Sequence, residues 1–576
     1  MPKTNEEVEE LLGEWAELQQ ITGRDPYRVR AYEKAARSIG GYSKDLRELD
    51  DKGILAIPNV GKNMLGRIRE YLDTGTMHEL EDLREMVPGG MRELLRIPGL
   101  GPKKAILVYE QLGVTNLAEL AAAAEANKLR GIKGLGAKTE ESLLRGIRNY
   151  TAQEERIMVD EAVEAAERVI ATLSETCTFD EITYAGSLRR MRETIGDIDV
   201  LVAASNAEPI MDAFASMARV REVKAKGATK TTIVTRRGLQ VDLRVVPYEA
   251  WGAALIYFTG SKAHNIKVRE IAVKRGLKLS EYGLFHAKDG SIIAARTEEE
   301  VYAALGLPWI PPTMREDRGE VEAALAGTLP TPVEARDLRG DLHTHTNLTD
   351  GLAPLEEMLE TASARGYAYY VVTDHAENLS MTGMSRDAVL EQRKKLKVLQ
   401  KRYPKMAILH GCELNIAKDG TVDYDPEFLA GFDLLVASVH SYFRLSAEEQ
   451  TKRLITAIEN PLVNVIGHPS GRMIGRRAPI DMDFGAVCEA AIRTGTALEV
   501  NSFPDRLDLR DDHVRWAVEA GVTLSVDTDS HAPKHMDNIR FGIATAQRGW
   551  ATKSDVLNTR TLKQLQEFVA RKRKRG

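Results

Sequence analysis

The chain has 576 residues, of which 43% are hydrophobic, so length and composition predict three or four globular domains. Its formal net charge of −6 argues against a uniformly basic nucleic-acid-binding protein, although one domain can carry a basic face within an acidic total. No apolar run reaches the roughly 18 residues of a membrane span, no signal-peptide core opens the sequence, and no CxxC pair occurs. We therefore expect a soluble cytoplasmic protein without disulfides or a membrane partner.

A glycine-containing turn recurs near the N-terminus, at 57–61, at 97–101 and, more weakly, at 132–136. Apolar residues at helical spacing flank the copies, which predicts a helix on either side of each turn. Glycine lets the backbone approach a ligand closely, and the free amides that begin the next helix bind phosphate. The pattern resembles the helix-hairpin-helix motif, which grips the DNA backbone without reading its sequence. The alternative is three plain connecting loops. The residues expected to contact DNA in these turns are Gly61, Lys62, Gly99, Gly101, Lys103, Gly134 and Gly136.

The segment 25–36, DPYRVRAYEKAA, resembles the N-terminal domain of family X DNA polymerases. The resemblance implies that Arg28, Arg30 and Lys34 hold the downstream 5′-phosphate of a DNA gap. Some family members cleave abasic sugar phosphates through a lysine Schiff base, and Arg67 stands where those members place the lysine. A guanidinium stays protonated and cannot form the imine, so we expect weak or no lyase activity.

Two predicted strands in the central region carry three carboxylates. Asp197 and Asp199 are two residues apart in GDIDVLV, so they face the same way, and Asp242 lies in the second strand, LQVDLRVV. Clustered carboxylates repel each other, and divalent cations relieve this repulsion. Two Mg²⁺ (or Mn²⁺) ions held there would activate an attacking 3′-hydroxyl and stabilise a leaving pyrophosphate. The alternative is a pair of solvated surface acids.

Nucleotide-binding residues are predicted on either side of this carboxylate pattern. Gly186, Ser187 and Arg190 precede it and are suited to hold a triphosphate. The order GS, DxD and a lone Asp resembles the nucleotidyltransferase fold shared by family X polymerases. The segment 257–269, YFTGSKAHNIKVR, resembles the signature of that family, and a helix-capping loop is the alternative.

The resemblance assigns individual roles within this signature. It implies that Tyr257, Phe258 and Gly260 lie under the sugar of the nucleotide and that Asn265 contacts its base, while Arg269 touches the template strand. Lys262 departs from the best-known members, which are not basic there. We expect this lysine to tighten nucleotide binding before DNA arrives.

Beyond a proline-rich stretch at 308–312, short apolar runs alternate with helical segments, which predicts an α/β barrel. Nearly every run ends in a metal-type ligand, and barrel enzymes place active residues at the carboxyl ends of their strands. Neutral imidazoles with carboxylates suit Zn²⁺, Mn²⁺ or Fe²⁺. A single histidine there would usually be structural. The predicted ligands are His343, His345, Asp350, His375, Glu413, His440, His468, Asp529 and His531.

The order of these ligands resembles that of the PHP (polymerase and histidinol phosphatase) domain. This sequence has a ligand at all nine metal-site positions of that family. The resemblance implies up to three metal ions and phosphoester hydrolysis, and beside a polymerase it implies 3′–5′ exonuclease activity, with cleavage at abasic sites as a further option. Arg472, Arg476 and Arg477 follow one ligand and are candidates for holding the DNA backbone, although such loops are often only solvated.

The sequence thus predicts a multidomain α+β and α/β protein with helical helix-hairpin-helix domains, a nucleotidyltransferase-type palm and a TIM-like (β/α) barrel. The predicted parts are a 5′-phosphate-binding domain at 1–85, a fingers-type domain at 86–150, the palm at 151–255, a nucleotide-selecting subdomain at 256–315, a linker at 316–337 and the barrel at 338–576. We expect a monomeric gap-filling repair polymerase that uses dNTPs and gapped or primer-template DNA. A small-molecule phosphatase with a degenerate polymerase half and a non-catalytic DNA-end scaffold are the alternatives.

Overall fold

The structure, a computed structural model, describes residues 3–575 except 23–25, 41–44, 58, 88–90, 95–99, 101, 133–134, 137–138, 142, 145–146, 148–155, 237 and 380–382. Compactness divides the chain into two units. One contains Met1–Arg156 with Ala215–Ala225 and Thr232–Val241, and the other contains the rest. Among the helices described, none combines the length and apolarity needed to cross a membrane.

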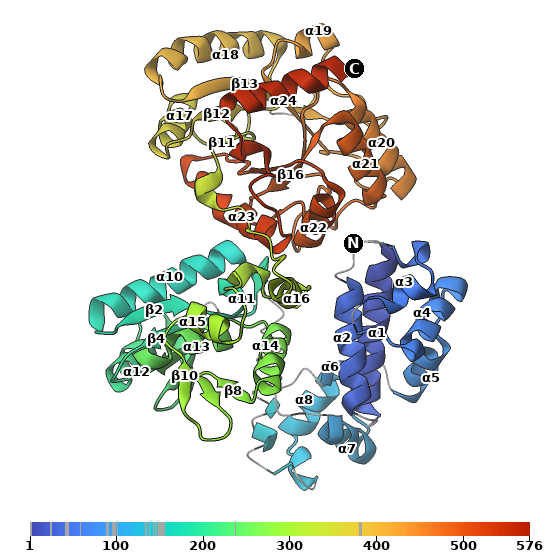
Figure 1. Cartoon of the computed structure of the whole chain (residues 1–576), viewed down its shortest axis with the longest axis vertical. Helices are drawn as coiled ribbons and strands as arrows, with labels where there is room; N and C mark the ends of the chain where they lie inside the picture. Colours follow the sequence, from blue (N-terminus) through green and yellow to red (C-terminus); the bar gives the residue numbers. More distant parts are fainter. Residues whose placement is uncertain are drawn as a thin grey trace. The chain divides into compact units, whose positions relative to one another are not determined.

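The N-terminal region is helical (Figure 1, blue). Val8, Leu12 and Trp15 recur at helical spacing in the first helix and are buried, and Trp15 stacks on Tyr32 with ring centroids 3.7 Å apart. Its elements are α1 (Lys3–Ile21), α2 (Pro26–Gly40), η1 (Leu46–Glu48), α3 (Asp51–Leu55), α4 (Lys62–Thr74), α5 (His78–Met86), α6 (Met91–Leu94), α7 (Pro102–Leu112), α8 (Leu117–Glu125) and η2 (Leu129–Gly131).

The next region is built on a five-stranded sheet with the order β2-β4-β7-β6-β5. The helix that precedes β2 buries Ala162, Val163 and Ala166 on one face and packs against β2 and β4. The elements are β1 (Ile157–Met158), α10 (Val159–Thr176), β2 (Glu181–Tyr184), α11 (Gly186–Arg189), β3 (Thr194–Ile195), β4 (Asp197–Ala203), α12 (Glu208–Ala215), β5 (Val220–Lys226), β6 (Lys230–Thr235) and β7 (Gln240–Val246).

A small subdomain with a three-stranded antiparallel sheet, order β10-β9-β8, follows. Residues 320–325, in the segment expected as a linker, form a helix whose Val321 and Ala324 join the core of this subdomain. Its elements are η3 (Tyr248–Ala250), α13 (Trp251–Thr259), α14 (Lys262–Lys274), β8 (Leu277–Ser280), β9 (Gly283–His286), β10 (Ile292–Ala294), α15 (Glu298–Ala304), η4 (Pro312–Met314), α16 (Glu320–Leu325) and η5 (Ala335–Asp337).

The C-terminal region is a parallel seven-stranded barrel with strands in sequence order. A bridge between Thr344 and Ser530 joins the segments that follow the first and last strands, which closes the barrel. The strands are almost fully buried because helices cover them, as Figure 1 shows (yellow to red), and their polar residues are buried as well. The strands are β11 (Gly340–Asp341), β12 (Tyr369–Val372), β13 (Ala407–Asn415), β14 (Leu434–Ser438), β15 (Val465–Gly467), β16 (Ala497–Asn501) and β17 (Leu524–Asp527).

Helices alternate with these strands, and the last one covers the strand starts. Leu565, Phe568 and Val569 of that helix are buried against residues such as Tyr369 and Leu434, which begin their strands. The opposite, carboxyl ends remain for the site. The helices are α17 (Leu355–Ala364), α18 (Arg386–Leu399), η6 (Gln400–Arg402), α19 (Pro426–Leu429), α20 (Ala447–Glu459), α21 (Phe484–Thr494), α22 (Asp511–Ala520), η7 (Pro533–Asn538), α23 (Ile539–Arg548), η8 (Leu557–Thr559) and α24 (Leu562–Arg575).

Candidate active sites

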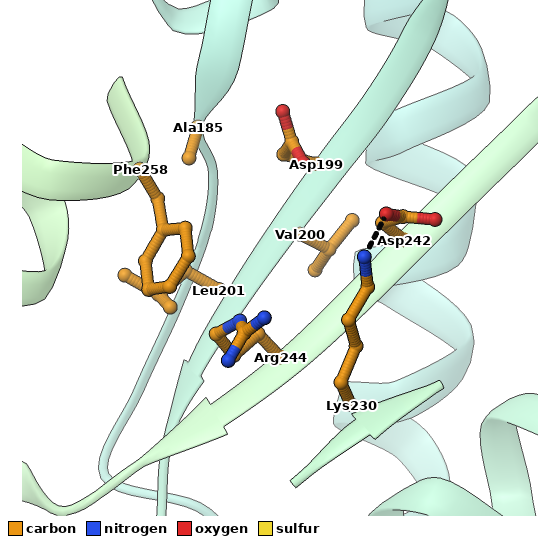
Figure 2. A pocket seen from close by; sticks show the side chains of 8 residues that line it. All are labelled: Ala185, Asp199, Val200, Leu201, Lys230, Asp242, Arg244 and Phe258. Carbon is orange, nitrogen blue, oxygen red and sulfur yellow. Dashed lines mark ion pairs between the residues drawn. The ribbon is translucent and has the colours of Figure 1, made fainter. Parts of the chain in front are cut away.

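The first candidate site lies on the five-stranded sheet, where β4 and β7 are neighbours. Asp197 and Asp199 are two residues apart on β4 and project from the same face, and Asp242 lies on β7. Figure 2 shows Asp199 and Asp242 on adjacent strands, where both line one pocket. The structure therefore brings together the carboxylates that the sequence singled out.

Three carboxylates concentrate negative charge at this site. Burial, followed by the like charges of Asp197 and Asp242, raises the pKa of Asp199 to about 7. Lys230 on β6 places its Nζ 2.6 Å from Oδ2 of Asp242, the ion pair drawn in Figure 2. Three carboxylates whose repulsion is large enough to shift a pKa fit divalent cations, which bind oxygen ligands of this kind.

Gly186 is the first residue of α11 and of the segment 186–192 after β2, the predicted triphosphate loop, and it lies against the carboxylate strand. Its φ is +59°, and a Cβ at this position would lie 2.1 Å from Oδ2 of Asp199. The carboxylate fills the space that a side chain would need, so only glycine fits here. The loop is thus held directly against the carboxylates, with Ser187 next in the chain.

Arg190 connects this loop to the turn at 257–261. Its Nε lies 2.9 Å from Oε1 of Glu316, and its Nη1 donates a hydrogen bond to the carbonyl oxygen of Thr259 at 2.5 Å. Gly260, with φ +71°, leaves room for this guanidinium, because a Cβ there would lie 3.2 Å from Nη1 of Arg190. The predicted triphosphate loop and the predicted nucleotide-selecting turn are therefore in contact.

The other residues predicted to bind the nucleotide lie along α13 and α14. Tyr257 is 39% exposed, and its carbonyl oxygen accepts a hydrogen bond from Nδ2 of Asn265 at 2.7 Å. Lys262 is exposed in the first turn of α14, which Ser261 caps by accepting a hydrogen bond from the His264 amide. One turn further, Arg269 donates from Nε to the carbonyl oxygen of Asn265 at 3.3 Å.

Lys230 and Arg244 also line the carboxylate pocket, although the sequence did not single them out. The Arg244 guanidinium lies over the ring of Phe258, 4.6 Å from its centroid, as Figure 2 shows. Lys230 begins the strand KTTIVT, and Arg244 lies two residues after Asp242 in VDLRVV. That placement was the available signal, but only the sheet order shows that they reach the site.

Several predicted DNA contacts lie in the N-terminal helices. Arg28 is exposed and Lys34 is half-buried, and Gly61 directly precedes α4. Gly61 has φ −101°, whereas Asn59 in the same turn has φ +67°. The left-handed residue of this turn is therefore Asn59, and Gly61 does not supply the bend that the sequence suggested. Predicted contacts outside the described residues, in whole or for the side chain, are Arg30, Gly99, Gly101, Lys103 and Gly134.

Arg67 is held within the helical core. Its Nε lies 2.6 Å from Oε2 of Glu79, its Nη1 donates to the carbonyl oxygen of Asn63 at 2.8 Å, and its guanidinium lies over the rings of Trp15 and Tyr32. These contacts give the arginine a packing role.

The second candidate site lies at the carboxyl ends of the barrel strands, with Glu413 of β13 at its centre. One Glu413 oxygen, Oε2, lies 3.0 Å from Nδ1 of His375 and 3.3 Å from Nε2 of His343. The other, Oε1, lies 3.1 Å from Nε2 of both His440 and His468. One carboxylate thus links four histidines from four segments of the chain.

The remaining predicted ligands complete the cluster. Oδ2 of Asp350 lies 3.1 Å from Nε2 of His375 and 3.4 Å from Nε2 of His531, and Nε2 of His345 lies 3.2 Å from Oδ1 of Asp529. All nine predicted ligands fall into four overlapping groups whose ligand atoms lie within 4.8 Å of one another. The structure therefore brings the whole predicted set together.

The chemistry of these side chains fits metal ions. Burial lowers the pKa of His345 to about 3, so its ring is neutral. Burial would raise the pKa of Glu413, but His440 and His343 hold it well below its usual value. Burial would lower the pKa of His343 and His375, but neighbouring carboxylates raise it. Imidazoles and carboxylates gathered in this way are the ligands of transition-metal sites.

Three residues that the sequence did not single out support the ligands. Oε1 of Glu499 lies 2.7 Å from Nδ1 of His343, and Oδ1 of Asn415 lies 2.8 Å from Nδ1 of His440. Nδ2 of Asn501 donates to Oδ2 of Asp529 at 3.0 Å. Such partners fix the orientation of ligand rings and carboxylates. Glu499 and Asn501 lie in ALEVN, which has the same apolar pattern as the other strands but carries no histidine.

Two of the three arginines after His468 have contacts within the protein. Arg472 is 7% exposed and places Nη2 2.5 Å from Oε1 of Glu193. Arg477 donates from Nε to the carbonyl oxygen of Gly471 and lies over the Phe443 ring. These contacts hold both side chains within the protein, and their contact with the DNA backbone stays a prediction.

The two sites define a nucleotidyltransferase joined to a metal-dependent barrel, and comparison with known proteins agrees. Family models match a helix-hairpin-helix domain at 3–77, a SAM-like helix-hairpin-helix tandem at 91–149, the DNA polymerase beta thumb at 254–316 and a PHP domain at 341–501. The fold class expected from the sequence is confirmed.

Similar proteins extend this result to the whole chain. The chain is 37% identical over 564 residues to the DNA polymerase/3′-5′ exonuclease PolX of Bacillus subtilis (strain 168), covering 97% of this chain and 98% of that protein. DNA polymerase lambda of Rattus norvegicus is 26% identical, covering 54% of this chain and 56% of the relative. A probable phosphatase of Thermoanaerobacter sp. (strain X514) is 31% identical and covers 41% of this chain and 96% of the relative. The chain belongs to the family X DNA polymerases that carry a C-terminal PHP domain.

Proposed function

We propose that this protein is a DNA-directed DNA polymerase that fills short gaps during DNA repair and that its barrel is a 3′–5′ exonuclease. One observation carries the proposal: a single chain holds a carboxylate cluster against a glycine loop and a separate nine-ligand cluster in a barrel. The relative of nearly equal length is named for these two activities.

At the polymerase site, Asp197, Asp199 and Asp242 would hold Mg²⁺ or Mn²⁺. Such ions, when bound, lower the barrier to attack by a 3′-hydroxyl and to departure of pyrophosphate. The Gly186 amide and the Ser187 hydroxyl bind the triphosphate. Arg190 keeps this loop against the turn whose residues select the nucleotide, namely Tyr257, Phe258, Gly260, Lys262 and Asn265, with Arg269 for the template strand.

At the barrel site, the nine ligands would hold up to three Zn²⁺, Mn²⁺ or Fe²⁺ ions, which supply a nucleophile and neutralise the phosphate. Most of the ligands are buried, but the side chains of Asp350, His531 and His440 are 33%, 24% and 15% exposed. The 3′ end of a DNA strand therefore reaches the cluster from the side formed by these three partly exposed residues.

The N-terminal residues bind DNA in this proposal. Arg28, Arg30 and Lys34 hold the downstream 5′-phosphate of a gap, and the three glycine turns at 57–61, 97–101 and 132–136 grip the backbone. We divide the chain into DNA-binding parts at 1–85 and 86–150, a palm at 151–255, a nucleotide-selecting part at 256–315, a linker at 316–337 and a nuclease at 338–576.

A phosphatase acting on small phosphate esters is the second candidate, because the probable phosphatase is matched over 96% of its length by about two-fifths of this chain. It leaves the carboxylate cluster and its glycine loop without a role. Hydrolysis of a small phosphate ester, with a labelled DNA primer left intact, would favour this candidate.

Two variants of the full chain test the proposal. Asp242→Ala is expected to abolish extension of a labelled primer and leave its shortening unchanged, because it removes one carboxylate of the first site only. His440→Ala is expected to do the reverse. If neither variant changes either activity, the assigned sites are wrong.

A further inference from the structure

Two hydrogen bonds from the barrel reach the predicted triphosphate loop. Nη1 of Arg548, the last residue of α23, donates to the carbonyl oxygens of Arg190 (3.4 Å) and Met191. Met191 has φ +52°, a left-handed conformation that few non-glycine residues adopt. The barrel thus contacts the loop at the residues that follow Gly186 and Ser187.

Contacts within the barrel fix the orientation of the Arg548 side chain. The residue is 2% exposed, and its Nε lies 3.0 Å from Oδ2 of Asp511 at the start of α22, while Nη2 donates to Oγ1 of Thr545 at 3.0 Å. Burial would raise the pKa of Asp511, but Arg318 and Arg548 hold it well below its usual value. The carboxylate is therefore ionised and keeps the planar guanidinium in one orientation.

The opposite side of the same loop is held by the nucleotide-selecting subdomain. Arg189 places Nη1 2.7 Å from Oγ1 of Thr259 and 2.7 Å from Oε1 of Glu298, in addition to the Arg190 contacts described above. On the barrel side, Nη1 of Arg192, at the end of the loop, lies 3.7 Å from Oδ2 of Asp511. The loop therefore lies between two supports, and only Arg548 contacts its backbone carbonyls from the barrel side among the described residues.

We propose that Arg548 is a positioning residue for nucleotidyl transfer, which makes the nuclease barrel a structural support of the polymerase site. This inference rests on the proposed function. Removal of the guanidinium would leave two partly buried carbonyls without this donor and would take from Asp511 one of its cationic partners, leaving Arg318 at 3.3 Å. The loop would then shift, and small displacements of binding groups cost large factors in rate.

The test uses the full chain with Arg548→Ala, Arg548→Lys and a matched control, Arg540→Ala. Arg540 lies on the same helix and also contacts the region of the sheet, with Nη1 3.1 Å from Oε1 of Glu167, but away from the loop. Lysine keeps the charge and most of the volume but cannot serve the carboxylate and both carbonyls together. Synthesis in a one-nucleotide gap is measured against dNTP concentration, and primer shortening is measured without dNTPs.

We expect both Arg548 variants to raise KM for the dNTP about 10-fold or more, with shortening within about twofold of the wild type and with Arg540→Ala unchanged in both assays. Loss of both activities in Arg548→Ala would mean that this variant does not fold. The KM of Arg548→Lys for the dNTP then tests the inference. An unchanged KM in a folded Arg548→Lys protein overturns the inference. Absence of synthesis by the wild type would instead reject the proposed function.

Discussion

Asp199 is the residue at which the first site is most sensitive to charge. Its pKa of about 7 lies above the value near 3.8 of an unfolded aspartate, so ionisation is disfavoured in the folded protein. A raised folded pKa means that stability present below pH 4 is lost as the pH rises through 7. Metal ions bound to the carboxylates would remove this penalty.

We therefore expect Asp199→Asn to be more stable than the wild type without divalent metal, by about 2–4 kcal/mol at pH 8 and less at pH 5. The reason is that asparagine has no charge to be buried or to be repelled by Asp197 and Asp242. Thermal unfolding in chelator at the two pH values measures the difference. Equal midpoints at pH 8 would show that ionised Asp199 carries no such penalty, and synthesis by this variant would argue against the catalytic role of Asp199.

Glu499 acts on the barrel site through His343. Glu499→Gln is expected to lower shortening of a primer about 10- to 100-fold, because the partner of a ligand histidine sets its ring orientation and basicity. Primer extension is expected to stay unchanged. Shortening rate and bound metal are measured on the same preparation; full metal occupancy with full activity would contradict the role.

The nine ligands were predictable residue by residue because histidine and carboxylate at strand ends form a pattern in the sequence. Glu499 and Asn415 were not, since their roles depend on which strands lie side by side. The same holds for Lys230, which reaches Asp242 only because β6 and β7 are neighbours.

At the scale of elements, the loop after β2 shows how one glycine ties a loop to a strand. Gly186→Ala places a Cβ where the Asp199 carboxylate lies. We expect a loss of synthesis of about 100-fold or more with shortening retained, because the carboxylate must move. The measurements are primer extension with dNTPs and primer shortening without them.

Gly238 provides the matched control for this substitution. It also has a positive φ, +87°, but a Cβ there would meet no described atom within 4 Å. Gly238→Ala bears the strain of the backbone alone, about 1–2 kcal/mol, and should keep synthesis. Equal losses in both variants would mean that backbone strain, and not the displaced carboxylate, is the cause.

Helix and strand patterns could be predicted where periodicity is strong, as in the barrel strands and around the glycine turns. The conformation of a turn was harder to predict. In the first turn Asn59, and not Gly61, adopts the left-handed backbone, which asparagine tolerates better than most residues. The other two copies carry Gly99 and Gly134 at the matching position, which was the available signal. A charged, helix-like stretch could be recognised between the two proline groups, and helix α16 at 320–325 lies there. The prolines suggested a linker, and the pattern did not show that this helix packs into the subdomain core.

At the scale of the whole molecule, the order of the motifs predicted the fold class, but not how the parts support each other. Arg548 contacts residues more than 350 positions away in the sequence, and no local sequence pattern predicts such a contact. The two sites use different ligands, so their chemistry is separate even where the barrel supports the loop.

The most direct test of two working sites in one chain uses a 5′-labelled primer in a one-nucleotide gap with a downstream 5′-phosphate. The purified protein is incubated with and without dNTPs, in Mg²⁺ and separately in Mn²⁺. We predict extension by one nucleotide with dNTPs and shortening from the 3′ end without them. A primer that shortens but never extends, or that does not change, would contradict the polymerase assignment, and one that only extends would contradict the nuclease assignment.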